Sequence, residues 1–425
     1  MKILISADAC TPFSGSEAHF GWSVVQCMAR RHDLWVITSG RHQADLERAA
    51  AQGMVPPSVT FAYANFPKPR HSNFIVSRFQ NWMEYSNFTR EAFVVGKKLH
   101  ESVQFDLVHH VTVSTWRMGL PFWKLGIPFI WGPIGGAEQF PLKLYSLLSA
   151  PSKAYELTRT LSNGLSRCSP SVRACARHAT HIATANNETK RLVAKLRGTE
   201  SGVSLLSPAF FPSSTIGEFS ALAPERRFDD PLRFFAGGML EGRKGVALAI
   251  EALARLKQQG MKLSFHIGGH GAELGHLRNL ADRLGLGTDV VFGLWKGTDY
   301  LNQLATSHVY LLPSLRESAG LTMMEAMLTG CVPVIADCGG PGHIVTEACG
   351  SKIPVGNAAA MIDSLTAAIA ALDTDRALLQ RKSIEATNRI TTSFSEEAYF
   401  QAMNNIYQQV THHQNDPAGQ NVQTA

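Results

Sequence analysis

Two glutamates in a short apolar stretch are the first residues whose placement suggests chemistry. Glu317 and Glu325 lie within "LRESAGLTMMEAMLTG", between the apolar runs "VYLLP" and "VPVIA". Such a pattern predicts a buried strand, its carboxyl-end loop, a short helix and the next strand. Glu317 then occupies the loop and Glu325 the helix, while Gly320, Leu321 and Thr322 present open backbone amides at the helix start. Carboxylates beside open amides suit a ligand that carries both hydroxyl and phosphate groups.

Apolar runs alternate with helical patterns through nearly the whole chain. The first half contains "KILISAD", "LWVITS", "FDLVHH", "IPFIWG" and "THIATAN", and from Leu232 the alternation restarts with "LRFFAGG", "LSFHIGG", "VVFGL", "VYLLPS" and "VPVIAD". Continuous apolar runs of this length predict parallel strands covered by helices on both faces. The predicted fold class is therefore α/β, with two doubly wound Rossmann-like domains.

The proline- and serine-rich stretch "SLLSPAFFPSSTIGE" interrupts this alternation and predicts the domain boundary. We expect an N-terminal Rossmann-like domain at residues 1–205 and a C-terminal one at residues 206–392. An amphipathic helix is predicted at 393–411, packing back toward the N-terminal domain. The polar tail, residues 412–425, is predicted to be disordered.

Composition excludes several classes of protein. With 425 residues, 45% of them hydrophobic and 17% charged, the chain is too long for one ordinary core and too apolar for a disordered protein. No uninterrupted apolar run reaches the roughly 20 residues that span a bilayer, so we expect a cytoplasmic protein. Seven scattered cysteines lack metal-site spacing, and a net charge of +6 is modest for this length. A nucleic-acid partner is not expected.

Three glycine-rich or polar loops follow predicted strands: "TPFSGSE", "GGMLEGRKG" and "GGHGAE". Turns of this kind at helix starts are ready anion sites, because unpaired amides and the helix dipole point at the ligand. None matches a P-loop or the full GxGxxG spacing. The loops favour a phosphate-bearing ligand held between the two domains; the alternative is that they are merely tight strand-to-helix turns.

The stretch "LLPSLRESAGLTMMEAMLTGCVPVIADCGGPGHIV" resembles the signature of glycosyltransferase family 4, which comprises retaining enzymes with two Rossmann-like domains facing each other, the GT-B architecture. The resemblance continues through "AGGMLEGRKGVALAIEAL", "IGGHGAELGHLRNLADRLGL" and "VVFGLW" and covers nearly all of the second domain. It is weaker in the first domain, in "TPFSGSEAHFGW" and "FDLVHHVT", while "WGPIGGAE" is similar to polysaccharide-type members. The resemblance implies an acceptor-side domain at 1–205 and a nucleotide-sugar donor domain at 206–392.

The resemblance also implies roles for individual residues of the donor domain. Glu325 would bind the donor ribose hydroxyls and Glu317 the hydroxyls of the donor sugar. The amides of Gly320, Leu321 and Thr322 would hold the distal phosphate. Lys244 would neutralise the leaving diphosphate as a point charge.

In the first domain, the Gly15–Ser16 turn would close over the donor phosphates or admit the acceptor. His109 matches a family histidine that faces the reacting sugar, although the second histidine often found two residues later is Val111 here. The role could thus fall to His109 or to His110. The alternative for either is a strand-end histidine whose hydrogen bonds are satisfied within the fold.

The chain departs from the family at several positions. Met239 stands where an arginine is usual, five residues before Lys244, and Ala319 and His343 replace an aromatic residue and a glutamate. We expect Arg243 to replace the missing arginine; the alternative is that it points into solvent. Because cationic side chains and helix amides can supply the charge, and no well-placed Asp-x-Asp is present, no metal or other cofactor is expected.

The predicted function is that of a retaining hexosyltransferase, which moves a sugar from a nucleotide-diphosphate sugar to a saccharide or lipid-linked oligosaccharide. The alternatives are a GT-B sugar-nucleotide epimerase and a non-catalytic subunit that binds a sugar nucleotide or a polysaccharide. A peripheral contact with the inner face of an anionic membrane is also predicted. It rests on basic residues (Lys143, Lys153, Arg159, Arg167, Arg173 and Arg177) interleaved with leucines (Leu142, Leu144, Leu147 and Leu148). A solvated helix face is the alternative.

Overall fold

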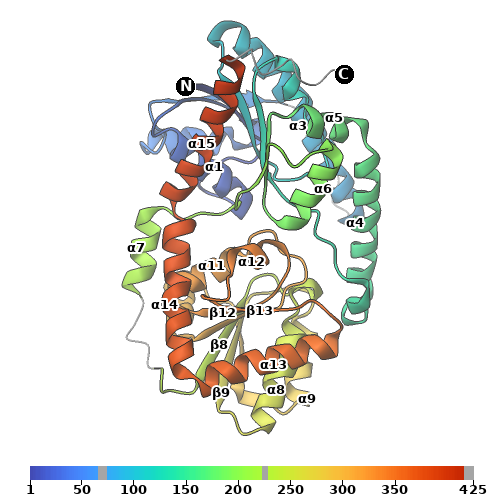
Figure 1. Cartoon of the computed structure of the whole chain (residues 1–425), viewed down its shortest axis with the longest axis vertical. Coiled ribbons are helices and arrows are strands. Elements are labelled where there is room, and N and C mark those ends of the chain that lie inside the picture. Colours follow the sequence, from blue (N-terminus) through green and yellow to red (C-terminus); the bar gives the residue numbers. More distant parts are fainter. Residues whose placement is uncertain (66–73, 223–227, 416–425) are drawn as a thin grey trace. The chain divides into compact units, whose positions relative to one another are not determined.

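The computed structural model describes residues 1–65, 74–222 and 228–415 of the chain and divides into two compact units. Unit 1 comprises Met1–Ala137, Ser162–Pro208 and Tyr399–Ala425, and unit 2 comprises Glu138–Leu161 and Ala209–Ala398. Figure 1 shows the elements of both units. No helix in the described ranges combines the length and the apolarity needed to cross a bilayer.

Within the described residues, unit 1 contains a seven-stranded parallel sheet in the order β3-β2-β1-β4-β5-β6-β7. The strands are β1 Lys2–Ala7, β2 Asp33–Ser39, β3 Val59–Ala64, β4 Leu107–Thr112, β5 Phe129–Ile134, β6 His181–Thr184 and β7 Val203–Leu205. The connecting helices are α1 Ser16–Met28, α2 Gln43–Ala51, α3 Phe74–Val103, α5 Pro170–His178 and α6 Asn187–Arg197. Every residue of β4 and β5 is buried, as expected of central strands in a parallel sheet.

Unit 2 repeats this design with a six-stranded parallel sheet, again within the described residues, in the order β10-β9-β8-β11-β12-β13. The strands are β8 Leu232–Gly237, β9 Leu263–Gly268, β10 Val290–Gly293, β11 Val309–Leu312, β12 Val332–Ala336 and β13 Ser351–Ile353. The helices are α7 Ser213–Ala221, α8 Val246–Gln258, α9 Leu274–Arg283, α10 Gly297–Thr306, α11 Leu321–Leu328, α12 Gly339–Ile344, α13 Ala358–Thr374 and α14 Arg376–Ser393. The prediction of two doubly wound Rossmann-like units is confirmed.

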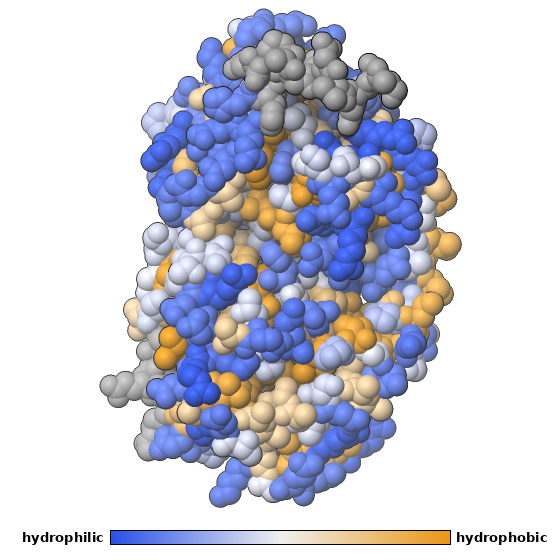
Figure 2. Space-filling view, in the orientation of Figure 1, coloured by the Kyte–Doolittle hydropathy of each residue, from blue (hydrophilic) through white to orange (hydrophobic). Residues whose placement is uncertain are grey.

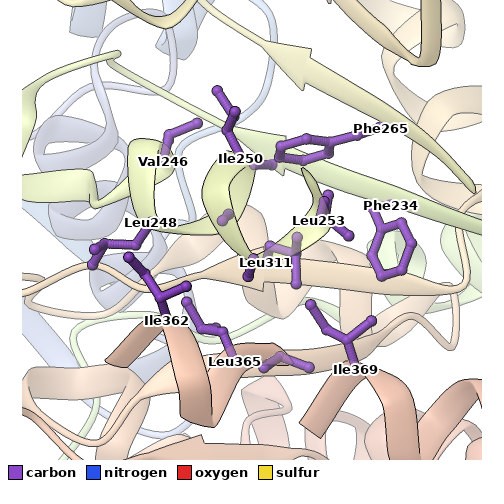
Figure 3. Close-up of a cluster of buried hydrophobic side chains, with 14 of the residues drawn as sticks. Phe234, Val246, Leu248, Ile250, Leu253, Phe265, Leu311, Ile362, Leu365 and Ile369 are labelled. Atoms are coloured by element: carbon purple, nitrogen blue, oxygen red, sulfur yellow. The ribbon is translucent and has the colours of Figure 1, made fainter. Parts of the chain in front are cut away.

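The core of unit 2 packs α8 and α13 against the sheet. Figure 3 shows Leu253 of α8 and Ile369 of α13 among side chains from the strands, including Phe234 and Leu311. These side chains are 0 to 1% exposed. The packing fixes the strands whose carboxyl ends carry the loops described below.

One segment lies in a different unit from the one that the sequence suggested. Residues 138–161, predicted to belong to the domain 1–205, form part of unit 2, and they include the first part of α4 (Ala150–Cys168). Phe140, Leu144 and Leu148 are buried in the core of unit 2 and account for this placement, because they add apolar surface to that core.

The last helix, α15, spans Glu396–Asn415, and the chain from Tyr399 onward belongs to unit 1. Tyr407 and Met403 of this helix are fully buried. The predicted helix at 393–411 therefore begins and ends slightly later in the structure. Residues 412–415, predicted to be disordered, instead form the end of this helix. The rest of the predicted tail lies outside the described residues.

Candidate active site

Two neighbouring loops of unit 2 bring opposite charges together. One loop follows β8 and carries Arg243 and Lys244; the other follows β11, the strand beside β8, and carries Glu317. The Lys244 ammonium donates a hydrogen bond to Oε2 of Glu317, and Arg243 Nη1 lies 3.6 Å from the same oxygen. These side chains are 11 to 19% exposed, so two cations converge on one partly enclosed carboxylate.

Backbone contacts hold the two loops against each other. Leu315 donates its N–H to the carbonyl of Arg243 at 2.9 Å, and the Ser314 hydroxyl donates to the same carbonyl at 3.3 Å. Gly245, the residue before α8, has a φ of 65°, and a Cβ there would lie 2.2 Å from the carbonyl oxygen of Pro313. A glycine is therefore required for the loops to approach this closely.

Arg243 neither points into solvent nor stands free. Its Nε donates to Glu241 at 2.6 Å, and its Nη1 donates to the carbonyl of Arg316 at 2.9 Å. The guanidinium thus lies beside the Glu317 loop, which is a suitable position for a second cation near Lys244. Met239, at the position of the family arginine, is 46% exposed and uncharged. That Arg243 replaces this arginine stays a prediction.

The start of α11 leaves backbone donors open next to these charges. Gly320 precedes the helix with a φ of 77°, and no side chain caps it. Met323 and Met324 donate their N–H groups to the Gly320 carbonyl, so the amides of Leu321 and Thr322 form the open end of the helix. These amides and the helix dipole favour an anion at this point.

Glu325 lies one turn further along α11 and is held by a residue that the sequence reading missed. The hydroxyl of Tyr300, from α10, donates to Glu325 Oε2 at 2.6 Å. Burial raises the pKa of the Glu325 carboxyl, and the Tyr300 hydrogen bond opposes that shift. Burial also raises the pKa of Tyr300, which keeps the phenol protonated as a donor. Nothing in "KGTDYLNQL" signals this partnership.

A second missed contact supports the Glu317 loop from α4. Arg316, the neighbour of Glu317, donates from Nε at 3.1 Å and from Nη2 at 2.7 Å to Oε1 of Glu156. Glu156 is 3% exposed, and the Arg316 guanidinium also lies 5.3 Å from the ring centre of Tyr155. The sequence carries one signal for it: Glu156 is the only acidic residue between Glu138 and Glu188.

Arg159, predicted to belong to a basic surface, is instead buried in this part of the structure. Its side chain is 9% exposed, with Nη1 donating to the Glu138 carbonyl at 3.0 Å and Nη2 lying 3.4 Å from the Glu138 carboxylate. The prediction for Arg159 was wrong because its charge is compensated within unit 2. Leu144 and Leu148 of the same predicted surface are buried as well.

The predicted role of His109 is not supported by its surroundings in unit 1. His109 is fully buried within β4, with Nε2 2.6 Å from the carbonyl oxygen of Gly132 and Nδ1 2.7 Å from the Tyr407 hydroxyl. Because a carbonyl only accepts, Nε2 carries the proton and Nδ1 accepts from Tyr407. Burial lowers the pKa of His109 to about 4, so the ring is neutral at pH 7 and has no nitrogen left for a ligand.

His110 is equally enclosed. Its ring nitrogens contact the Ser6 hydroxyl at 3.1 Å and the Tyr85 hydroxyl at 2.9 Å, and burial lowers its pKa to about 3. The alternative interpretation, a strand histidine satisfied within the fold, therefore applies to both histidines. Gly15, with a φ of 56°, and the exposed Ser16 form the start of α1 in unit 1, and their part in donor binding stays a prediction.

Comparison with known proteins finds a family match in the second part of the chain. Residues 221–385 match the family model described as Glycosyl transferases group 1, which agrees with the resemblance described for this stretch. Over 155 residues the chain is 33% identical to the putative colanic acid biosynthesis glycosyltransferase WcaL of Escherichia coli K12, a match that covers 34% of this chain and 37% of that protein. The matched regions span less than half the length of the curated relatives.

Solved structures match over nearly the whole chain. The lipopolysaccharide outer core galactosyltransferase WaaB gives a TM-score of 0.63 at 15% identity, covering 96% of this chain and 99% of that one. HepE of Anabaena, in complex with UDP, gives 0.58 at 15% identity, covering 96% and 100%. At this identity the likeness defines the fold, which is the GT-B fold of glycosyltransferases.

Proposed function

We propose that the protein is a retaining glycosyltransferase that moves a hexosyl group from a nucleotide-diphosphate sugar to a saccharide or lipid-linked oligosaccharide acceptor. The observation that carries the proposal is the convergence of Lys244 and Arg243 on Glu317, beside the open amides of α11 and within the stretch that matches the glycosyl transferase group 1 model. The UDP bound to HepE and the colanic acid role in the name of WcaL support the donor and acceptor classes.

Two cations and open backbone amides at one point suit a diphosphate leaving group. Negative charge grows on the diphosphate as the glycosidic bond breaks, and positioned charges that meet it lower the barrier. Phosphate oxygens compete with Glu317 for Lys244 and Arg243. Once displaced from these cations, the carboxylate of Glu317 accepts hydrogen bonds from the donor sugar hydroxyls.

Glu325 binds the ribose, because its carboxylate accepts hydrogen bonds from neighbouring hydroxyls while Tyr300 fixes its orientation. Retention follows if the departing phosphate oxygen takes the acceptor proton on the same face of the sugar. Neither Glu317 nor a histidine then has to act as nucleophile or base, which agrees with the enclosed positions of His109 and His110.

We also propose that the protein works in the cytoplasm, at the inner face of a membrane where a lipid-linked acceptor is available. The names of WcaL and WaaB, which refer to colanic acid and to lipopolysaccharide, support an acceptor of this kind.

A panel of nucleotide sugars, each incubated with and without saccharide acceptors, tests the proposed activity. We expect nucleotide diphosphate release that depends on an acceptor, a product with the donor's anomeric configuration by NMR, and activity that survives EDTA. Acceptor-independent conversion of the donor would indicate an epimerase. Donor binding without turnover would indicate a non-catalytic subunit. Inversion of configuration would contradict the mechanism.

A further inference from the structure

The solvent-facing side of α4 carries three leucines in a row. Leu157, Leu161 and Leu165 are 52%, 68% and 75% exposed. Residues four apart lie on the same face of a helix, so these side chains form one apolar line, which we call the leucine stripe. Figure 2 shows apolar side chains along the right-hand edge of the surface, where Figure 1 places α4. Single exposed leucines are common, whereas a continuous stripe indicates a surface that binds something.

The opposite side of α4 fixes the orientation of the helix. Its buried residues are Glu156, which pairs with Arg316, Arg159, which pairs with Glu138, and Asn163, which is 1% exposed. Turning the leucines inward would break both ion pairs and place unpaired charges against apolar surface. The leucine stripe therefore faces outward as a consequence of the fold.

The exposed charge along this part of the chain has one sign. Residues 139–187 contain six basic residues: Lys143, Lys153, Arg159, Arg167, Arg173 and Arg177. The single acidic residue in the same range, Glu156, is buried. On α4 itself, Lys153 is half-buried and Arg167 is exposed. No acidic side chain of α4 is exposed, because Glu156 is buried on the opposite side of the helix. An apolar stripe flanked by basic side chains is complementary to a surface that is anionic outside and apolar beneath, and it repels a second copy of itself.

We propose that the leucine stripe docks onto an anionic lipid bilayer. In this arrangement α4 lies in the plane of the interface, with Leu157, Leu161 and Leu165 at the acyl boundary and Lys153 and Arg167 at the headgroup phosphates. The proposed surface differs from the one read from the sequence, of which Leu144, Leu148 and Arg159 are buried. The inference rests on the proposed function, because docking would bring the protein to a lipid-linked acceptor. Vesicle binding itself requires no turnover, so it can be tested separately from the activity.

Flotation of the full chain with phosphatidylcholine vesicles, with and without phosphatidylglycerol, tests the inference. We expect binding to the phosphatidylglycerol vesicles. The triple variant Leu157→Gln, Leu161→Gln, Leu165→Gln should lower the partition coefficient at least about tenfold, because the buried apolar area is lost. Lys153→Gln and Arg167→Gln should each lower it about fivefold on anionic vesicles and have little effect on neutral ones.

A matched control is the double variant Val94→Gln, Ile384→Gln, which removes side chains that are 57% and 56% exposed on other helices. It should float like the unchanged chain. Thermal unfolding of every variant verifies that the fold is kept. The inference is overturned if the unchanged chain stays at the bottom of the gradient or if the triple variant floats normally. It is also overturned if sedimentation shows that the triple variant dissociates a dimer, because the stripe would then join two copies.

Discussion

The two units have similar parallel sheets but place their polar side chains at different depths. In unit 1, His109 and His110 lie within β4, fully buried, with their ring nitrogens partnered inside the unit. In unit 2, Lys244 and Glu317 lie in loops beyond the strand ends and keep some exposure. A buried imidazole must stay neutral and in place, whereas a loop ion pair can exchange its partner for a ligand. The same topology therefore provides a rigid framework in one unit and the proposed ligand site in the other.

The largest effect is expected from removing Lys244, the central cation of unit 2. Lys244→Ala should lower kcat by 10²- to 10³-fold, about 3–4 kcal/mol, because the lost charge meets the diphosphate as it departs. The donor KM should change less, since the charge is greatest in the transition state. Steady-state kinetics with the best donor of the panel measures both. Lys262→Ala, at an exposed position of the same unit, is the control. A kcat within twofold of the unchanged protein would remove Lys244 from the mechanism.

The buried histidines of unit 1 should appear in the pH dependence of stability rather than in turnover. The pKa of His109 is about 4 when folded and 6.5 by itself, so below pH 6.5 the unfolded chain binds a proton that the folded chain does not. The free energy of unfolding therefore falls as pH falls, by about 3 kcal/mol between pH 6.5 and 4 for this residue alone. His109→Gln should flatten the slope by up to about 1.4 kcal/mol per pH unit.

Denaturant unfolding followed by tryptophan fluorescence is suited to this measurement, because all tryptophans except Trp295 belong to unit 1. The Lys244→Ala variant should keep the slope of the unchanged protein. At pH 8, His109→Gln should retain kcat within a fewfold. A loss of several orders of magnitude in kcat would restore the role that the family resemblance implied for His109.

These contrasts show how much the sequence could predict. The apolar runs predicted both sheets, and the resemblance selected Lys244 and Glu317 although 73 residues separate them. The burial of His109 could not be predicted from the sequence, because its hydrogen-bond partners Gly132 and Tyr407 are 23 and 298 residues away. Such pairings depend on tertiary packing, which no local pattern records.

The same limit explains the misplaced segment 138–161. In the sequence it continues the helical and basic pattern of the first half, and only the packing of Phe140, Leu144 and Leu148 in the core of unit 2 reveals where it lies. The support of Arg316 by Glu156, 160 residues away, was hidden for the same reason.

The Glu156–Arg316 ion pair can be removed without changing a residue of the proposed ligand site. Glu156→Ala should destabilise unit 2 by about 2 kcal/mol, because it leaves the Arg316 guanidinium, 13% exposed, without its counter-ion. It should also lower kcat about tenfold, since the loop that carries Glu317 loses its anchor. Trp295 fluorescence in a variant with the other tryptophans replaced, together with kinetics, measures both. The double variant Glu156→Gln, Arg316→Met should recover stability, as it removes both charges. If kcat stays constant in Glu156→Ala, the contact is structural only.

The smallest expected effect concerns Tyr300, which holds the second glutamate of unit 2. Tyr300→Phe removes one hydrogen bond to the Glu325 carboxylate, which should raise the donor KM about fivefold, or about 1 kcal/mol, and leave kcat unchanged. Glu325→Ala should raise KM further in the same direction, and Glu317→Ala should instead lower kcat.

The hydrogen bond from Tyr300 also favours the charged carboxylate, so its loss raises the pKa of Glu325 beyond the increase that burial already causes. The KM of Tyr300→Phe should therefore rise more steeply than that of the unchanged protein as the pH falls, because protonated Glu325 no longer accepts from two ribose hydroxyls. Equal KM values for the two proteins across the pH range would mean that Tyr300 only fills space beside α11, and that Glu325 binds the donor without its help.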